Sequence, residues 1–426
     1  MERASLSGYP DGMAIATRTD VIVEAAPEDV GLSSVGLRNL ARLVQGYVDD
    51  QKLPGAISLV ARRGRVVHFE TYGNMDHERQ TPMRADAIFR FYSMTKPIAS
   101  VGLMMLYQEG KFQLDDPVSK FIPELKDLKV FAGGTADNFE VRDPHRAMTV
   151  RDLLMHTSGL VARDSASPVG ELYRRAGFQG ADSRFTLAEM VGKLAHIPLE
   201  VDPGSRWIYG ISTDVVGHLC EVIGGMPFDR YLEERIFAPL GMDDTGFTVP
   251  ASKVERFAAN YAPQGGTPRY RLVDDPTTSP YTRPRTYLSG SGGLVSTAAD
   301  YLRFCAMLRN GGELYGIRIL GPRTLQLMTL NHLPGGRDLA SMAQSAAETQ
   351  REGQGFGLGF AVLLDQTVAQ IIGTPGEFYW GGAASTAFFV NPKEELIVIF
   401  LTQLRPSSTY PIRRELRTTI YSSIID

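Results

Sequence analysis

The placement of strand-like segments along the chain constrains the fold more than any other feature. Two β-rich runs near the N-terminus, 56–62 and 66–72, flank Arg63-Gly64-Arg65 and predict a hairpin. A third short run, 87–92, leads directly into a helix, and the other strand-like runs lie near the C-terminus, at 356–364, 384–390 and 396–404. Since a sheet must bury one face against other elements, we expect strands from both ends of the chain to pair in one antiparallel sheet.

The residues between these ends have a helical pattern. Loops rich in proline and glycine join candidate helices at 150–156, 187–194, 212–223 and 228–236. Further helices are expected at 32–48, 93–109, 297–309, 322–328 and 411–424. The helix at 93–109 is apolar on nearly every face, which indicates burial in the centre of the molecule.

The sequence therefore predicts an α+β fold, in which an antiparallel sheet is flanked by helices and carries an inserted α-helical domain. The expected boundaries are an N-terminal arm at 1–30, a sheet domain made of 31–113 and 288–426, and a helical domain at 114–287.

Composition and charge exclude several classes of function. The 44 basic and 48 acidic residues nearly cancel, and no dense basic patch of the kind that binds nucleic acid occurs. No apolar run approaches the 18 or so residues of a membrane span, and no apolar segment near Met1 marks a secretory signal. We therefore expect a cytoplasmic protein whose partner is a small molecule, not nucleic acid or a membrane; the oligomeric state stays open.

Metal and nucleotide chemistry are also disfavoured. The two cysteines, Cys220 and Cys305, are far apart, and the seven histidines show no metal-ligand spacing. The chain has no phosphate-binding glycine motif and no G-x-S-x-G nucleophile elbow. We expect no metal and no cofactor.

One strand-to-helix junction carries a candidate nucleophile. Ser93 and Lys96 lie three residues apart where a short strand is expected to enter the buried helix, so the ammonium can reach the hydroxyl. Backbone N–H groups at a helix N-terminus favour the negative charge that develops during nucleophilic attack. Lysine is rarely placed in such a position for packing. The alternative is a serine that only caps the helix.

Tyr209 lies at a similar junction before a helix. A phenol close to an ammonium group can serve as a base, and packing in the core is the alternative interpretation.

Five motifs in order resemble the serine β-lactamase-like superfamily, which includes class C β-lactamases, DD-peptidases and family VIII carboxylesterases. They are Ser93-Met94-Thr95-Lys96, His156-Thr157-Ser158-Gly159-Leu160, Tyr209, Ser291-Gly292-Gly293 with the residues up to Asp300, and Trp380-Gly381-Gly382. The resemblance spans residue 30 to the C-terminus and implies an antiparallel sheet flanked by helices, with a helical domain across a cleft.

The resemblance also implies roles for individual residues. Ser93 would be the acylated nucleophile, Lys96 its base, and Tyr209 a second base that returns the proton to the leaving alkoxide. The segment Trp380-Gly381-Gly382 would correspond to the edge-strand K-T-G motif. The N–H groups of Ser93 and Ala383 would then form the oxyanion hole.

Two departures from the family pattern bear on the substrate. Ile211 replaces the asparagine of the usual Y-x-N, and Trp380 replaces the lysine of K-T-G, which pairs with a substrate carboxylate. An indole offers an apolar wall instead of a cation, although core packing is an alternative role for Trp380. We expect Tyr92, Ile211, Trp380, Gly381 and Gly382 to contact the substrate.

The resemblance and its departures together predict a serine carboxylesterase that hydrolyses short-to-medium acyl esters through an acyl-serine intermediate. A weak cephalosporin-hydrolysing side activity is also expected. An acyltransferase, or a hydrolase of β-lactams or D-amino-acid peptides, on the same scaffold is the alternative. A catalytically silent scaffold that binds an acyl ligand is the alternative of another class.

Overall fold

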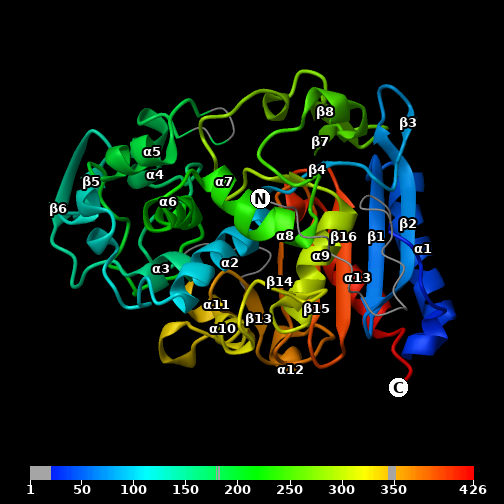
Figure 1. Cartoon of the computed structure of the whole chain (residues 1–426). Coiled ribbons are helices and arrows are strands. Elements are labelled where there is room, and N and C mark those ends of the chain that lie inside the picture. Colours follow the sequence, from blue (N-terminus) through cyan, green and yellow to red (C-terminus); the bar gives the residue numbers. More distant parts are fainter. Residues whose placement is uncertain (1–20, 179, 181–182, 344–351) are drawn as a thin grey trace, which may run out of the picture.

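Strands from both ends of the chain pair in one antiparallel sheet, as the sequence predicts (Figure 1). The computed structural model describes residues 21–178, 180, 183–343 and 352–426. Residues 1–20 of the predicted arm at 1–30 are therefore outside the described residues. The eight strands follow the order β12 (Gln354–Phe356), β13 (Ala361–Leu363), β14 (Phe378–Gly381), β15 (Ala387–Asn391), β16 (Leu396–Thr402), β1 (Gly55–Arg62), β2 (Arg65–Asp76) and β3 (Thr81–Pro82).

The pairing of β1 with β16 joins the two ends of the chain. Its register runs from Ala56 opposite Thr402 to Arg62 opposite Leu396, and β2 forms the predicted hairpin on the other side of β1. Every residue of β1 is buried, because the strand lies inside the sheet and helices cover both faces.

Adjacent residues of β15 show which helices cover which face. Phe388 packs its ring against Tyr301 of α9 (Ala298–Arg309), and Phe389 stacks on Tyr421 of α13 (Ile412–Tyr421). Successive side chains of a strand point to opposite faces, so α9 and α13 lie on opposite sides of the sheet. The N-terminal helix α1 (Ser34–Asp49) packs beside α13, where Tyr47 donates a hydrogen bond to Glu415.

The predicted buried helix is α2 (Thr95–Gln108), and all of its residues from Thr95 to Leu106 are buried. It begins directly after a short 3₁₀ turn, Tyr92–Met94, and packs against α6 (Ser212–Gly224). None of the helices among the described residues is long and apolar enough to cross a membrane.

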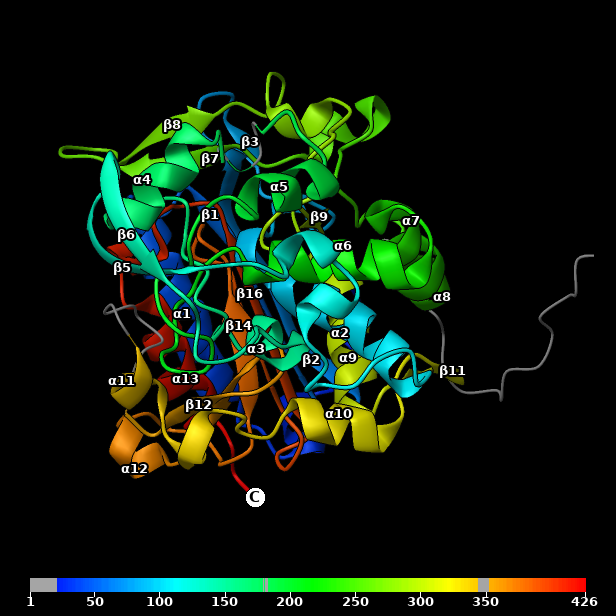
Figure 2. The same cartoon turned by 90° about the vertical axis from the view of Figure 1, so that its left-hand side faces the viewer.

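Most helices of the middle segment lie to one side of the sheet (Figures 1 and 2). Besides α6 they are α3 (Val150–Leu154), α4 (Pro168–Arg175), α5 (Leu187–Leu194), α7 (Phe228–Leu232) and α8 (Ala238–Leu240). This segment also contains two hairpins, β5 (Val130–Thr135) with β6 (Asn138–Arg142), and β7 (Asn260–Pro263) with β8 (Tyr270–Asp274). The expectation of helices and loops alone is therefore wrong. Every residue of β6 is exposed, so no buried apolar alternation marks that strand in the sequence.

The predicted single strand at 356–364 is also wrong, because it contains parts of β12 and β13 with a tight turn between them. The turn is closed by the Gly357 N–H, which donates to the Phe360 carbonyl, and Gly359 adopts a φ of +97°. Only glycine takes such a conformation freely. The remaining elements are β4 (Phe89–Arg90), β9 (Val295–Ser296), β10 (Glu313–Leu314), β11 (Ile317–Arg318), α10 (Pro322–Met328), α11 (Leu339–Met342) and α12 (Gln366–Ala369).

Candidate active site

A two-stranded pairing brings the Ser93 junction against a segment 200 positions later in the chain. β4 pairs with β9, and the chain on either side continues the contact. The Phe91 N–H donates to the Leu294 carbonyl over 3.0 Å, and the Leu294 N–H donates to Thr95 Oγ1 over 3.1 Å. The loop just before Leu294 therefore lies beside the start of α2.

The structure brings Ser93 and Lys96 together. Lys96 Nζ lies 3.3 Å from Ser93 Oγ and donates a second hydrogen bond, over 2.8 Å, to the Ser291 carbonyl. The Lys96 side chain is buried, whereas Ser93 is partly exposed in the 3₁₀ turn that leads into α2. The amine is thus held within proton-transfer distance of a hydroxyl that a substrate can reach.

Tyr209, in the segment just before α6, lies next to this pair. Lys96 Nζ lies 4.4 Å from the centroid of the Tyr209 ring, and Trp380 Nε1 donates to the Tyr209 hydroxyl over 3.2 Å. Tyr209 itself lies three residues before α6 in an extended segment, which the hydrogen bond from the Ile208 N–H to the His156 carbonyl holds in place. Residues predicted from three separate motifs therefore meet in one place.

Five rings line this place, and we call them the aromatic wall: His156, Trp207, Tyr209, Phe356 and Trp380. The Tyr209 ring centroid lies 4.9 Å from that of His156, 5.8 Å from that of Trp207 and 5.3 Å from that of Trp380. Burial and the nearby Lys96 charge hold the pKa of His156 well below its usual value. The imidazole is therefore neutral near pH 7.

Strand β14 contains Trp380 and Gly381, and Gly382 directly follows it. β14 is an interior strand of the sheet, so the expectation of an edge strand is wrong as stated. Its pairing with β13 ends at Tyr379, however, while its pairing with β15 continues to Gly381. Among the described residues, Trp380 and Gly381 thus have no strand partner on one side. A β-carbon on Gly382 would collide with the Phe91 carbonyl oxygen, so only glycine lets this strand end approach the Ser93 junction closely.

The turn that follows β14 presents the predicted second oxyanion donor. The Gly382 N–H donates to the Thr386 carbonyl over 2.9 Å, and the Ser385 N–H donates to the Gly382 carbonyl over 3.1 Å. Between them, the Ala383 N–H has no hydrogen-bond acceptor within the part of the chain that the structure describes. It is available to a ligand.

The two remaining candidates occupy the margins of the site. The Tyr92 hydroxyl accepts a hydrogen bond from Asn260 Nδ2 over 2.8 Å, and burial raises the pKa of this phenol. Tyr92 has a φ of +44°, and Gly292 packs against its backbone. Ile211 is buried at the start of α6, where its N–H donates to the Val161 carbonyl.

Sequence reasoning missed Asp214, a fully buried carboxylate on α6. Its Oδ1 accepts hydrogen bonds from Ser289 Oγ over 2.6 Å and from the Ser291 N–H over 3.1 Å. Asp214 therefore holds the loop whose Ser291 carbonyl anchors Lys96. The available signal was an aspartate five residues after Tyr209 inside an apolar helix, because buried aspartates almost always have a structural partner or a function. No group of three or more potential metal ligands is found among the described residues.

Comparison with known proteins identifies the family of this chain. A family model described as Beta-lactamase matches residues 40–420. Esterase EstB from Burkholderia gladioli is 32% identical over 424 residues, which cover 93% of this chain and 99% of that protein. Monacolin J acid methylbutanoyltransferase from Aspergillus terreus is 27% identical, with 88% of this chain and 92% of that protein covered.

A solved structure is similar over nearly the same length. EstCE1, described as a hydrolase with promiscuous acyltransferase activity, superposes with a TM-score of 0.75 at 27% identity. The match covers 91% of this chain and 98% of EstCE1. Because the family model spans most of the chain and EstB is related over almost its whole length, the chain belongs to the Beta-lactamase family, within the serine β-lactamase-like superfamily.

Proposed function

We propose that this protein is a serine carboxylesterase that hydrolyses short-to-medium acyl esters through an acyl-Ser93 intermediate. An esterase or acyltransferase on a β-lactamase fold is the broader activity class that its relatives support. The observation that carries the proposal is the distance of 3.3 Å between Lys96 Nζ and Ser93 Oγ, with the Tyr209 ring directly beside the ammonium.

In the proposed acylation step, Ser93 Oγ attacks the ester carbonyl carbon and gives its proton to the Lys96–Tyr209 pair. The carbonyl oxygen becomes an oxyanion and accepts hydrogen bonds from the N–H groups of Ser93 and Ala383. Tyr209 then donates the proton to the departing alkoxide, and the C–O bond of the ester breaks. Water repeats the sequence on the acyl-enzyme and releases the carboxylic acid and free Ser93.

The aromatic wall supports a neutral acyl group as the preferred substrate. Trp380 stands where a lysine would pair with a substrate carboxylate, its side chain is 6% exposed, and its indole N–H already binds the Tyr209 hydroxyl. An anionic ester would have to leave water without a cation at this position, which is unfavourable. A weak cephalosporin-hydrolysing side activity is part of the proposal, because acylation would use the same groups.

The test compares wild type, Ser93→Ala and Ser100→Ala on p-nitrophenyl butyrate. Ser100 is a buried serine about two turns further along α2, so Ser100→Ala is a matched control, which we expect to retain activity. We expect Ser93→Ala to lose at least about a thousandfold in kcat, as removal of a nucleophile does. Retained turnover in Ser93→Ala would refute the acyl-serine mechanism. Nitrocefin, assayed in parallel, measures the side activity.

A second substrate pair tests the aromatic wall. p-Nitrophenyl hemisuccinate has the same acyl length as the butyrate ester but ends in a carboxylate. We expect kcat/KM for the butyrate to exceed that for the hemisuccinate by about tenfold or more, which corresponds to about 1.4 kcal/mol. Equal values would contradict the assignment of Trp380 as an apolar substrate wall.

Acyl transfer is the second candidate, because EstB is an esterase by name whereas monacolin J acid methylbutanoyltransferase moves an acyl group and EstCE1 does both. Adding 1-butanol to the p-nitrophenyl butyrate assay distinguishes the two. Butyl butyrate as the main product would make transfer the principal activity, and butyric acid as the main product supports hydrolysis.

A further inference from the structure

The turn after β14 is tied to the opposite face of the sheet by one arginine. Tyr379 faces α13, as its ring contact with Arg417 shows, whereas the next residue, Trp380, faces Tyr209. At the end of the strand, Arg413 of α13 donates from Nη2 to the Gly382 carbonyl over 2.6 Å and to the Thr386 carbonyl over 2.8 Å. One nitrogen atom thus holds both ends of the turn.

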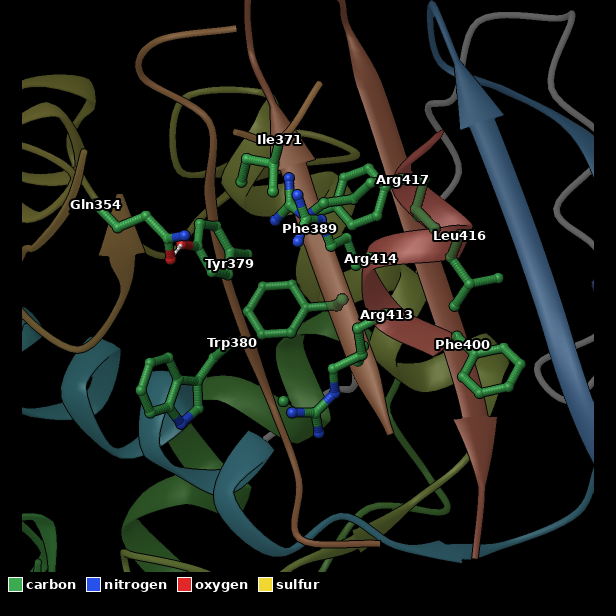
Figure 3. A pocket seen from close by; sticks show the side chains of 14 residues that line it. Gln354, Ile371, Tyr379, Trp380, Phe389, Phe400, Arg413, Arg414, Leu416 and Arg417 are labelled. Atoms are coloured by element: carbon green, nitrogen blue, oxygen red, sulfur yellow. Dashed lines mark hydrogen bonds between the residues drawn. The ribbon is translucent and has the colours of Figure 1, made fainter. Parts of the chain in front are cut away.

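The sequence of β14 admits this contact because of a glycine. A β-carbon on Gly381 would lie 2.6 Å from Arg413 Nη2, so any side chain there would displace the guanidinium. Figure 3 shows Arg413, Arg414 and Arg417 projecting from α13 into one pocket beside β14. Trp380 lies on the other side of this strand. Of the three, Arg414 donates to the Gln370 carbonyl, and Arg417 pairs with the buried Glu377.

The hydrogen bond from Arg413 to the Gly382 carbonyl acts on the peptide group between Gly382 and Ala383. The Gly382 carbonyl and the Ala383 N–H belong to the same planar peptide, in which C=O and N–H point in opposite directions. A cation that holds the carbonyl therefore also directs the N–H away from α13. Charge-assisted hydrogen bonds are stronger than neutral ones, and a hydrogen bond at one end of a peptide strengthens the bond that its other end makes.

We propose that Arg413 is a positioning residue of the oxyanion hole, which orients and polarises the Gly382–Ala383 peptide from behind the sheet. This inference rests on the proposed function, because it takes the Ala383 N–H as an oxyanion donor. Arg413 touches neither substrate nor Ser93 in this role. It acts through the peptide that it holds.

The experiment compares Arg413→Met with Arg414→Met. Methionine keeps an unbranched apolar stem but removes the donors, and Arg414 is the neighbouring residue on the same helix and in the same pocket. Loss of a complete oxyanion donor lowers kcat by about 10²–10³-fold, so loss of its orientation should cost less. We expect Arg413→Met to lower kcat by about 10–100-fold with KM changed by less than about threefold, and Arg414→Met to behave as wild type.

A second readout separates positioning from general damage to the fold. Butylboronic acid forms a tetrahedral adduct when Ser93 Oγ donates an electron pair to boron and its proton passes to the Lys96–Tyr209 pair, and one boronate oxygen then occupies the oxyanion hole. We expect its inhibition constant to rise in Arg413→Met by about the same factor as kcat falls. A partly unfolded preparation lowers kcat but leaves the inhibition constant of the remaining active enzyme unchanged, and that result would overturn the proposal.

The outcomes also distinguish this inference from the proposed function. If Ser93→Ala is inactive while Arg413→Met and Arg414→Met have the same kcat and inhibition constant, the role of Arg413 is wrong and the esterase mechanism stands. If Ser93→Ala remains active, the mechanism itself fails. Should Arg413→Met not fold, Arg413→Gln, whose amide is too short to hold both carbonyls, decides by the same two measurements.

Discussion

Replacing Tyr209 by phenylalanine tests whether its phenol takes part in catalysis or only packs in the site. The substitution removes a single oxygen and keeps the ring contacts with Lys96 and with the rest of the aromatic wall. In the structure that oxygen accepts one hydrogen bond, from Trp380 Nε1 over 3.2 Å. A neutral hydrogen bond of this kind contributes about 1 kcal/mol.

The two roles predict different magnitudes. If the phenol only packs, the loss of about 1 kcal/mol corresponds to at most about a fivefold change in rate. If Tyr209 is the second base, its loss lowers kcat by about 10²–10⁴-fold, or about 3–5.5 kcal/mol of transition-state stabilisation. We expect the larger effect, with KM for p-nitrophenyl butyrate little changed.

Tyr301→Phe is the matched control for this measurement. The Tyr301 hydroxyl also makes one hydrogen bond, to the Met94 carbonyl beside Ser93, over 3.1 Å, and its ring packs on Phe91. Both variants therefore lose one hydrogen bond close to Ser93, and urea unfolding measures that shared cost. A kcat for Tyr209→Phe within fivefold of wild type, or equal to that of Tyr301→Phe, would show that the phenol has no role as a base.

Three further predictions concern stability and the shape of the site. Arg90→Met should lower the free energy of unfolding by about 3–5 kcal/mol in urea, since it leaves the Asp274 carboxylate without its buried partner at 2.7 Å; a loss below 1 kcal/mol would contradict this. Gly382→Ala should lower kcat by at least about tenfold on p-nitrophenyl butyrate, because its β-carbon displaces the Phe91 carbonyl; wild-type kcat would contradict the close approach. Because the pKa of His156 is lowered in the folded protein, this imidazole takes up a proton more readily in the unfolded chain. The free energy of unfolding should therefore fall as the pH drops below about 6.5, by up to about 1.4 kcal/mol per pH unit. In His156→Asn the decrease should be less steep. Identical slopes in urea titrations between pH 7 and 5 would refute it.

Helix positions were the most predictable part of the fold. The expected helices at 187–194 and 322–328 coincide with α5 and α10, and the central burial of α2 is confirmed. These elements are determined locally, by apolar periodicity and by capping residues such as Thr186, which caps α5. Segments without a buried face of their own, such as β6, carried no such signal.

The candidate site was predictable to the level of motifs but not of contacts. Ser93 and Lys96 are three residues apart, so their proximity follows from helical geometry. The approach of Tyr209 and Trp380 to Lys96 depends on how α6 and β14 pack, which no local pattern encodes. Asp214 was missed for the same reason, because its partners Ser289 and Ser291 lie 75 and 77 residues further along the chain.

The sequence by itself determined the hairpin of β1 and β2, the buried helix α2 and the proximity of Ser93 and Lys96, because short-range spacing decides which side chains share one helix face or one strand face. Only the tertiary structure decided which rings line the site and which backbone groups face it. The Ala383 N–H has no acceptor among the described residues, and Arg413 holds the carbonyl of the same peptide, because β14 ends beside the first turn of α13. Contacts of this kind join elements that are distant in sequence, and their geometry is set by the packing of the whole sheet between its two layers of helices.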